Sequence, residues 1–216
     1  MPDRISPSER GVENRTDQGN DIAVTRSTLR CTGIAAREAL SADEHLHLST
    51  ALDDHLRCLL QRCRPRILGF CWPIRGEFDC RPLAAHLIER GVHCCLPRVT
   101  DGSMTMTFHA WHPGSAMEVD RHGIPTPSDG APLLPDMLLI PVNVFDTAGY
   151  RLGYGAGYFD RTLAALTPRP LSIGIGFELA RTANIYPAWH DVPLDAVVTE
   201  AGIEVFSARF AAECAD

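Results

Sequence analysis

The stretch that decides the fold reads LLIPVNVFD over residues 138–146 and continues as GYRLGYGAGYFDR over residues 149–161. The apolar run at residues 137–140 predicts a buried strand, and the residues from Tyr158 onward predict a helix. Three alternating glycines, Gly153, Gly155 and Gly157, join the two. Glycine lets the backbone approach a ligand closely, and the amides at a helix start attract phosphate. The pattern therefore predicts a phosphate-binding loop, without the Gly-Lys-Ser/Thr of a P-loop or the usual Rossmann spacing.

Charged residues flank this glycine loop (residues 153–157). Arg151 and Arg161 are placed to neutralise a polyphosphate through forked hydrogen bonds. Asp160, one turn into the expected helix, is a candidate ligand for a magnesium ion that bridges phosphate oxygens. The alternative is a glycine-rich turn with surface charges. Three glycines, two arginines and an aspartate at one strand-to-helix junction favour the phosphate interpretation.

Outward from the loop, helical and strand-like stretches alternate along the chain. Helices are expected at residues 27–38, 41–62, 80–90 and 158–166, and strands at residues 67–72, 92–96, 104–111, 137–140, 171–177, 196–199 and 203–206. Ser41 and Glu44 have the spacing of a capping box. Residues 112–135 contain five prolines and are expected to form a long loop. The alternation predicts a three-layer α/β/α fold with a mostly parallel central sheet.

Composition limits the class of protein. The chain has 216 residues, 45% hydrophobic and 22% charged, which is typical of one globular domain with a real core. Its formal net charge of −7 disfavours a sequence-independent grip on nucleic acid. No apolar run reaches membrane-spanning length. Residues 1–24 are polar and aperiodic, so we expect a disordered extension followed by one domain over residues 25–210.

The eight cysteines are scattered, without a C-x-x-C pair. The first residues are polar and contain no apolar region of a signal peptide. A disulfide framework is therefore not expected, and we interpret the thiols as reduced and the protein as cytoplasmic.

Matches along most of the chain identify a resemblance. They run from Arg26 to Thr199 and comprise Leu29-Arg30, Arg37, Leu40-Ser41, PIRGEFD (73–79), RPL (81–83), LPR (96–98), Gly123-Ile124, the glycine loop, HDVPLD (190–195) and VTE (198–200). In these motifs the chain resembles the 5-formyltetrahydrofolate cyclo-ligase family, whose loop reads close to RLGYGGGYYDR.

The resemblance implies an α/β ligase that closes 5-formyltetrahydrofolate to 5,10-methenyltetrahydrofolate while it splits ATP to ADP and phosphate. A formamide oxygen is a poor leaving group, and phosphorylation by ATP converts it to a good one. The neighbouring nitrogen then attacks the activated carbon and phosphate departs. Such catalysis is mostly positioning and neutralisation of phosphate charge. The implied cofactors are ATP and Mg²⁺, and the implied partner is a reduced folate.

The resemblance also implies roles for individual residues. The ATP-binding set is Arg26, Arg30, Arg151, Leu152, Gly153, Tyr154, Gly155, Ala156 and Gly157, and Arg151 and Tyr154 are the implied catalytic residues. Glu77, Tyr154 and Trp72 are the implied substrate-binding residues, and Phe70 is a weaker candidate for the pterin pocket. Asp160 and Asp191 are the implied magnesium ligands.

Two positions depart from the family pattern. Arg26 stands where the family usually has lysine, which keeps the charge but directs its donors differently. Thr126 stands where a glutamate is common after the Gly-Ile pair. These departures leave open a nucleotide-binding paralogue with another substrate or none, and a nucleic-acid-binding module is the rival from a different class. We expect a monomer or weak homo-oligomer that binds neither nucleic acid nor membrane.

Overall fold

The computed structural model describes the backbone of residues 7–214 and the side chains of residues 21–214. Its elements in chain order are α1 (Pro7–Glu38), α2 (Ala42–Cys63), β1 (Ile67–Gly69), α3 (Arg81–Glu89), β2 (His93–Val99), β3 (Met106–Ala110), β4 (Met117–Val119), β5 (Pro125–Pro127), β6 (Pro132–Leu133), β7 (Met137–Pro141), β8 (Val144–Asp146), β9 (Arg151–Leu152), α4 (Tyr158–Ala165), β10 (Leu171–Ile175), the 3-10 helix η1 (Glu178–Ala180), β11 (Arg181–Thr182), β12 (Ala196–Thr199), β13 (Gly202–Val205) and α5 (Ala208–Glu213).

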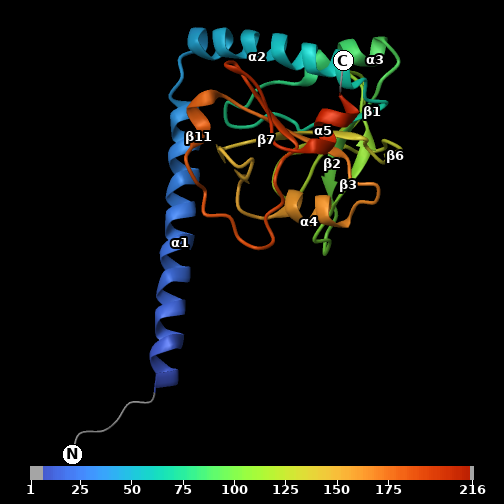
Figure 1. Cartoon of the computed structure of the whole chain (residues 1–216). Helices are drawn as coiled ribbons and strands as arrows, with labels where there is room; N and C mark the ends of the chain where they lie inside the picture. Colours follow the sequence, from blue (N-terminus) through green and yellow to red (C-terminus); the bar gives the residue numbers. More distant parts are fainter. Residues whose placement is uncertain (1–6, 215–216) are drawn as a thin grey trace, which may run out of the picture.

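An eight-stranded sheet in the order β13-β12-β10-β7-β1-β2-β3-β6 forms the centre of the molecule. Its inner strands β12, β10, β7, β1 and β2 run parallel. The outer strands β13, β3 and β6 pair antiparallel with their neighbours. Helices α2 and α3 lie on one face and α4 on the other (Figure 1). The predicted three-layer fold with a mostly parallel sheet is confirmed, and the small sheet β11-β8-β9 is an addition to it.

The alternation of side chains along β7 explains the two layers. Met137 and Leu139 belong to the core cluster that contains Leu52 and Leu56 of α2. Leu138 and Ile140 belong to the second cluster, which contains Leu163 of α4. Both faces of a parallel strand are buried, so its sequence reads as a continuous apolar run.

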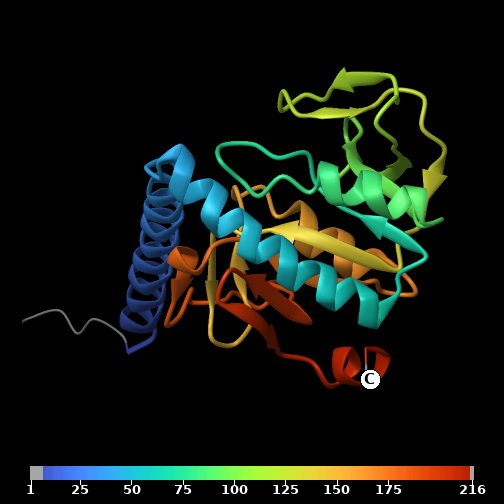
Figure 2. The ribbon, with the colours of Figure 1, turned by 90° about the horizontal axis from the view of Figure 1, so that it is seen from above.

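Helix α2 begins as the sequence predicts. The Ser41 side chain accepts from the Glu44 amide, and the Glu44 carboxylate accepts from the Ser41 amide at 2.9 Å. Leu52, Leu56 and Leu59 then bury one stripe of the helix against the sheet, which α2 crosses diagonally (Figure 2). None of the helices in the described part of the chain is long and apolar enough to cross a membrane.

The expected loop at residues 112–135 is wrong in part. It contains the hairpin β4-β5, which projects beyond α3 in Figure 2, and the edge strand β6. The hairpin turn is held by Asp120, whose carboxylate accepts from the amides of His122 and Ile124. Prolines at β5 and β6 concealed these strands, because proline cannot donate in a ladder and is confined to edges.

The two ends of the chain extend beyond the expected boundaries. Helix α1 begins at Pro7, although we expected residues 1–24 to be disordered and the helix to start at residue 27. Once a helix is nucleated by packed residues, adding further turns costs little, which allows α1 to continue outward from the domain (Figure 1). The first six residues of the expected extension lie outside the described residues. At the other end, α5 buries Phe210 and reaches beyond residue 210.

The expectation that all cysteines are reduced is wrong for one pair. Cys63 at the end of α2 is bonded to Cys214 after α5, with 2.04 Å between the sulfurs. The two residues are 151 positions apart, and only the fold brings their Cα atoms to 4.4 Å. The other six cysteines are free, as expected.

Candidate active site

The glycine loop connects β9 to α4 beside the carboxyl end of the central strands. Gly155 has φ of +100° and Gly157 has φ of +66°, in the region that L side chains rarely adopt. Among the described residues, the amides of Tyr154, Gly155 and Ala156 have no hydrogen-bond acceptor. These three residues are exposed. Unpaired amides at the start of a helix form a site suited to phosphate.

Two arginines hold the loop from either side. Arg30 of α1 donates from Nε to the Gly153 carbonyl at 2.7 Å. Arg161 of α4 donates from Nη2 to the Ala156 carbonyl at 2.6 Å and from Nε to the Met104 carbonyl at 2.7 Å. Within the described residues, each arginine keeps at least one terminal nitrogen of its guanidinium without an acceptor. Both groups are therefore available for charge-assisted hydrogen bonds to a polyphosphate on the loop.

Arg151 lies differently from the expectation that it contacts phosphate. It is buried, and its guanidinium donates to the Val192 carbonyl at 2.8 Å and to Asp160 Oδ1 at 3.1 Å. The same Asp160 oxygen accepts from the Val192 amide at 3.0 Å. Burial lowers the pKa of Arg151, and the Asp160 charge opposes that shift. Arg151 therefore connects the segment around Val192 to the first turn of α4 through Asp160.

Arg26 and Asp191, two implied ligand-binding residues, are bound to each other. Arg26 donates to both carboxylate oxygens of Asp191, at 2.6 and 3.2 Å, and to the Tyr186 carbonyl at 2.9 Å. Asp191 also accepts from the Ala188 amide at 2.6 Å. Burial by itself raises the pKa of Asp191, but Arg26 and the Ala188 amide outweigh it and the net shift is downward.

Tyr154 connects the glycine loop to Glu77. Its hydroxyl donates to Glu77 Oε1 at 2.9 Å and accepts from Arg37 Nη2 at 3.1 Å. The second Glu77 oxygen accepts from the Ile74 amide at 3.1 Å. Burial raises the pKa of Glu77, and the Ile74 amide, Tyr154 and Arg37 partly offset this. Burial and the Glu77 charge also raise the pKa of Tyr154, so its hydroxyl keeps its proton near neutral pH.

Arg37 is the residue that sequence reasoning left out of the site. Besides Tyr154, it donates to Asn143 Oδ1 at 2.9 Å and to the carbonyls of Arg75 and Val142. A signal was present in the sequence, because residues spaced three and four apart share one face of a helix. Arg26 and Arg30 are four residues apart, and Arg37 follows Arg30 by seven residues, or two turns, so all three lie on one side of α1.

The residues implied for the pterin pocket are divided by the structure. Trp72 is half-buried, and the guanidinium of Arg81 lies over its ring at 4.4 Å. Phe70 is 1% exposed and packs edge-on against Trp111, with 5.2 Å between the ring centres. Phe70 is therefore a core residue, and its expected place in the pocket wall is wrong because its ring is enclosed on all sides. Thr126 is also buried and donates to the Pro97 carbonyl at 3.1 Å.

The fit to a magnesium ion rests on one carboxylate. Within the described residues, no group of three His, Cys, Asp or Glu side chains could hold a metal ion. Asp191 uses both oxygens on Arg26 and Ala188, whereas Asp160, among the described residues, accepts only at Oδ1. Magnesium in phosphate sites commonly takes one or two carboxylates and completes its shell with phosphate oxygens and water. Asp160 fits such an arrangement and Asp191 does not.

A glycine loop between a strand and a helix, flanked by arginines and joined to a buried glutamate, defines the class of an α/β protein with a nucleotide-type phosphate site. The sequence pattern of the 5-formyltetrahydrofolate cyclo-ligase family matches residues 22–200. The chain belongs to this family of ligases.

Individual relatives agree with the family match. The 5-formyltetrahydrofolate cyclo-ligase of Escherichia coli strain K12 is 33% identical over 131 residues, which cover 57% of this chain and 72% of the relative. The protein of the same name from Mycoplasma genitalium is 33% identical over 178 residues, covering 81% and 98%. The solved structure of Aquifex aeolicus 5,10-methenyltetrahydrofolate synthetase has a TM-score of 0.72 at 28% identity, covering 84% of this chain and 92% of that one.

Proposed function

We propose that this protein converts 5-formyltetrahydrofolate to 5,10-methenyltetrahydrofolate with cleavage of ATP to ADP and phosphate. Family membership supports the reaction. The main observation that supports this site for the reaction is that Tyr154 belongs to the glycine loop and donates a hydrogen bond to Glu77. A nucleotide on the loop and a folate against Glu77 would therefore meet at this residue.

The reaction joins two steps. The γ-phosphoryl group of ATP is transferred to the formyl oxygen, and ADP is the leaving group. The neighbouring nitrogen then attacks the formyl carbon, and the oxygen leaves with phosphate. Because the oxygen leaves as phosphate rather than as hydroxide, ring closure becomes accessible. The protein contributes mainly alignment of the two substrates and neutralisation of charge.

On the nucleotide side, the unpaired amides of residues 154–156 and the guanidinium groups of Arg30 and Arg161 bind the phosphates. Magnesium, held by Asp160 together with the phosphates, would supply further neutralisation of their charge. Arg151 and Arg26 support the site indirectly. Each binds the 186–192 segment and holds it against the site instead of facing the glycine loop.

On the folate side, Glu77 is an acceptor for the N–H groups of a pterin ring. Arg37 and Tyr154 set its orientation from one side and the Ile74 amide from the other. Tyr154 acts as a hydrogen-bond donor and not as a base, since its pKa is raised. Trp72 supplies an aromatic edge beside this position.

The location, oligomeric state and binding partners of the protein complete the proposed function. We take the protein to act in the cytoplasm as a monomer or weak homo-oligomer that binds no nucleic acid. The net charge of −7 supports the last point, since nucleic-acid phosphates repel an acidic chain. Light scattering after gel filtration tests the oligomeric state, and a salt-dependent gel shift tests the absence of nucleic-acid binding.

The test of the reaction is an absorbance assay of purified protein with 5-formyltetrahydrofolate, ATP and magnesium, following the methenyl product. Product that forms only with both ATP and magnesium supports the proposal. No product, with ATP binding still measurable by calorimetry, would overturn the substrate and leave the paralogue with another substrate. No ATP binding would overturn the function of the glycine loop itself.

A further inference from the structure

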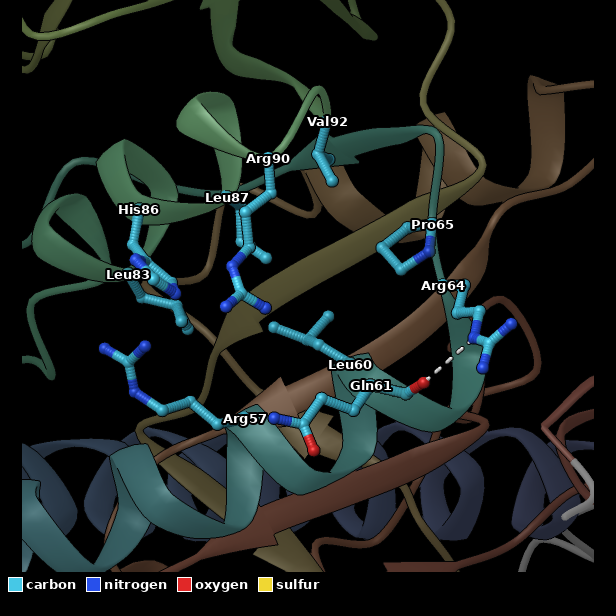
Figure 3. A pocket seen from close by; sticks show the side chains of 10 residues that line it. All are labelled: Arg57, Leu60, Gln61, Arg64, Pro65, Leu83, His86, Leu87, Arg90 and Val92. Atoms are coloured by element: carbon cyan, nitrogen blue, oxygen red, sulfur yellow. Dashed lines mark hydrogen bonds between the residues drawn. The ribbon is translucent and has the colours of Figure 1, made fainter.

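A cavity distinct from the candidate active site lies at the end of the sheet opposite the glycine loop, where the parallel strands begin. Its lining includes Pro65, which precedes β1, and Val92, which precedes β2. The candidate active site, in contrast, lies beyond the carboxyl ends of β1 and β7. The cavity measures about 480 Å³ and is bounded by α2 and α3 (Figure 3). Pockets for small molecules commonly have volumes of about 300–1,000 Å³.

The charged residues of this cavity all have one sign. Its lining is Arg57, Leu60, Gln61, Arg64, Pro65, Leu83, His86, Leu87, Arg90 and Val92. Three arginines and a histidine are present in this set, and the lining itself contains no carboxylate; Asp53, which pairs with Arg57, lies outside it. Figure 3 shows the side chains of Arg57, on α2, and of Arg90, directly after α3, on opposite sides of the space between the two helices. Two like charges that face one space favour an anion between them.

The guanidinium groups have capacity left for such an anion. Arg57 donates from Nε to Asp53 Oδ2 at 2.6 Å, and its terminal nitrogens have no acceptor among the described residues. The side chain of Arg90 has no polar partner in the described part of the chain. Arg64 donates to the Gln61 carbonyl at 3.3 Å, so it caps the last turn of α2. Cations at a helix end neutralise its dipole, which accounts for Arg64. Arg57, more than a turn earlier, is held by its i,i+4 ion pair with Asp53, which engages only Nε.

The floor of the cavity is apolar. Leu60 and Leu83 are 4% and 2% exposed and belong to the main core cluster, and Leu87 packs against that cluster. A cavity with an apolar floor and cationic walls is complementary to a molecule with an apolar body and an anionic head. An inorganic ion alone would leave the floor unused.

We propose that the cavity between α2 and α3 binds a small organic anion, a phosphate or carboxylate on an apolar body, through Arg57 and Arg90. The head group accepts from both guanidinium groups, and the body rests on Leu60 and Leu83. His86 lies beside Leu83 in the lining (Figure 3). The site is separate from the candidate active site and does not depend on the proposed reaction.

The test is a titration of the ¹⁵N-labelled full chain with phenyl phosphate, followed residue by residue in amide spectra. We expect saturable shifts at Leu60, Leu83 and Leu87. Arg57→Gln with Arg90→Gln should raise the Kd at least tenfold, because hydrogen bonds to charged groups are lost at both walls. Arg66→Gln is the matched control, since Arg66 is near in sequence, is 92% exposed and does not line the cavity.

Three outcomes overturn the proposal. One is an unchanged Kd in the double variant, provided that its amide spectrum shows the native fold. Another is shifts confined to the glycine loop. The third is equal affinity for phenyl phosphate and inorganic phosphate, which would leave an adventitious ion only. Benzoate, titrated in the same way, distinguishes a carboxylate head from a phosphate head.

Discussion

Tyr154 is the residue on which the two halves of the candidate site depend. Its backbone lies in the glycine loop, while its hydroxyl lies between Arg37 and Glu77. The hydroxyl satisfies a Glu77 oxygen that Arg37 approaches only to 3.9 Å. Replacing it therefore leaves a buried acceptor without its main partner, which costs more than the loss of an exposed hydrogen bond.

We expect Tyr154→Phe to lower kcat/KM for the folate about 10- to 100-fold, from the loss of about 1.5–3 kcal/mol for a hydrogen bond to a charged group. The Kd for ATP should stay within about twofold, because the loop backbone is retained. Steady-state kinetics and calorimetry measure the two quantities. Weaker ATP binding with unchanged folate kinetics would contradict the assignment.

Asp160 and Asp191 differ in their free oxygens, so they should differ in their response to magnesium. Asp160→Asn should raise the magnesium concentration needed for half-maximal rate about tenfold or more, because one carboxylate ligand is lost. Asp191→Asn should leave that concentration unchanged, even where it lowers the rate. Titration of the rate with magnesium at saturating ATP measures this. Equal shifts in both variants would contradict the distinction.

Asp191 also predicts how stability depends on pH. Its folded pKa is lowered from 3.8, so its contribution is present above pH 3.8 and is lost as pH falls through the folded value. Asp191→Asn should therefore be less stable than the parent at pH 7, by about 1–3 kcal/mol for the lost charged hydrogen bonds. The gap should close below pH 3.8. Urea unfolding at both pH values measures it, and a gap independent of pH would contradict the ion pair.

At the scale of elements, α1 and the glycine loop depend on each other. Arg26, Arg30 and Arg37 reach from one side of α1 to three parts of the site: the 186–192 segment, the glycine loop and the Tyr154–Glu77 pair. Charge on one side of a helix usually indicates a solvated face, but here the side packs onto the domain. The candidate site is thus partly assembled by the first described helix.

Gly157 directly precedes α4, and its backbone conformation is the reason that a glycine is required there. We expect Gly157→Ala to lower the free energy of unfolding by about 1–2 kcal/mol, because φ of +66° is unfavourable for an L side chain. The added Cβ would also lie 2.9 Å from Arg161 Nη1 and displace it, which should weaken ATP binding. Gly153→Ala is the control for stability, since its Cβ meets no atom within 4 Å. Equal loss of stability in both variants would contradict this account.

At the scale of the whole molecule, the Cys63–Cys214 bond ties the end of α2 to the segment after α5. A cross-link between positions 151 apart restricts the unfolded chain strongly. We expect Cys214→Ser to lower the free energy of unfolding by about 2–4 kcal/mol, and a reductant to have the same effect on the parent. Cys58→Ser, at an exposed free cysteine, is the control. Eight titratable thiols in the denatured, unreduced protein would contradict the bond.

Most of the fold could be predicted from local pattern. The capping box at Ser41, the leucine stripe of α2 and the apolar run of β7 follow from hydrogen bonding and periodicity over a few residues. The strands β4, β5 and β6 escaped prediction because they are two or three residues long, and β5 and β6 also contain prolines. In such strands the pairing partner, and not the local sequence, decides the conformation.

The candidate site divides along the same line. The sequence alone determined its residue types and the order in which they occur: three alternating glycines, the arginines of α1, Glu77 and the aspartates. Only the tertiary structure decided which of these bind other groups of the protein and which keep free hydrogen-bonding capacity. It turned Arg151 and Asp191 toward neighbouring protein groups, enclosed Phe70, and joined Arg37 to Tyr154 and Glu77. The reason is that a side chain's partner is set by distances between segments far apart in the chain, which no local pattern contains.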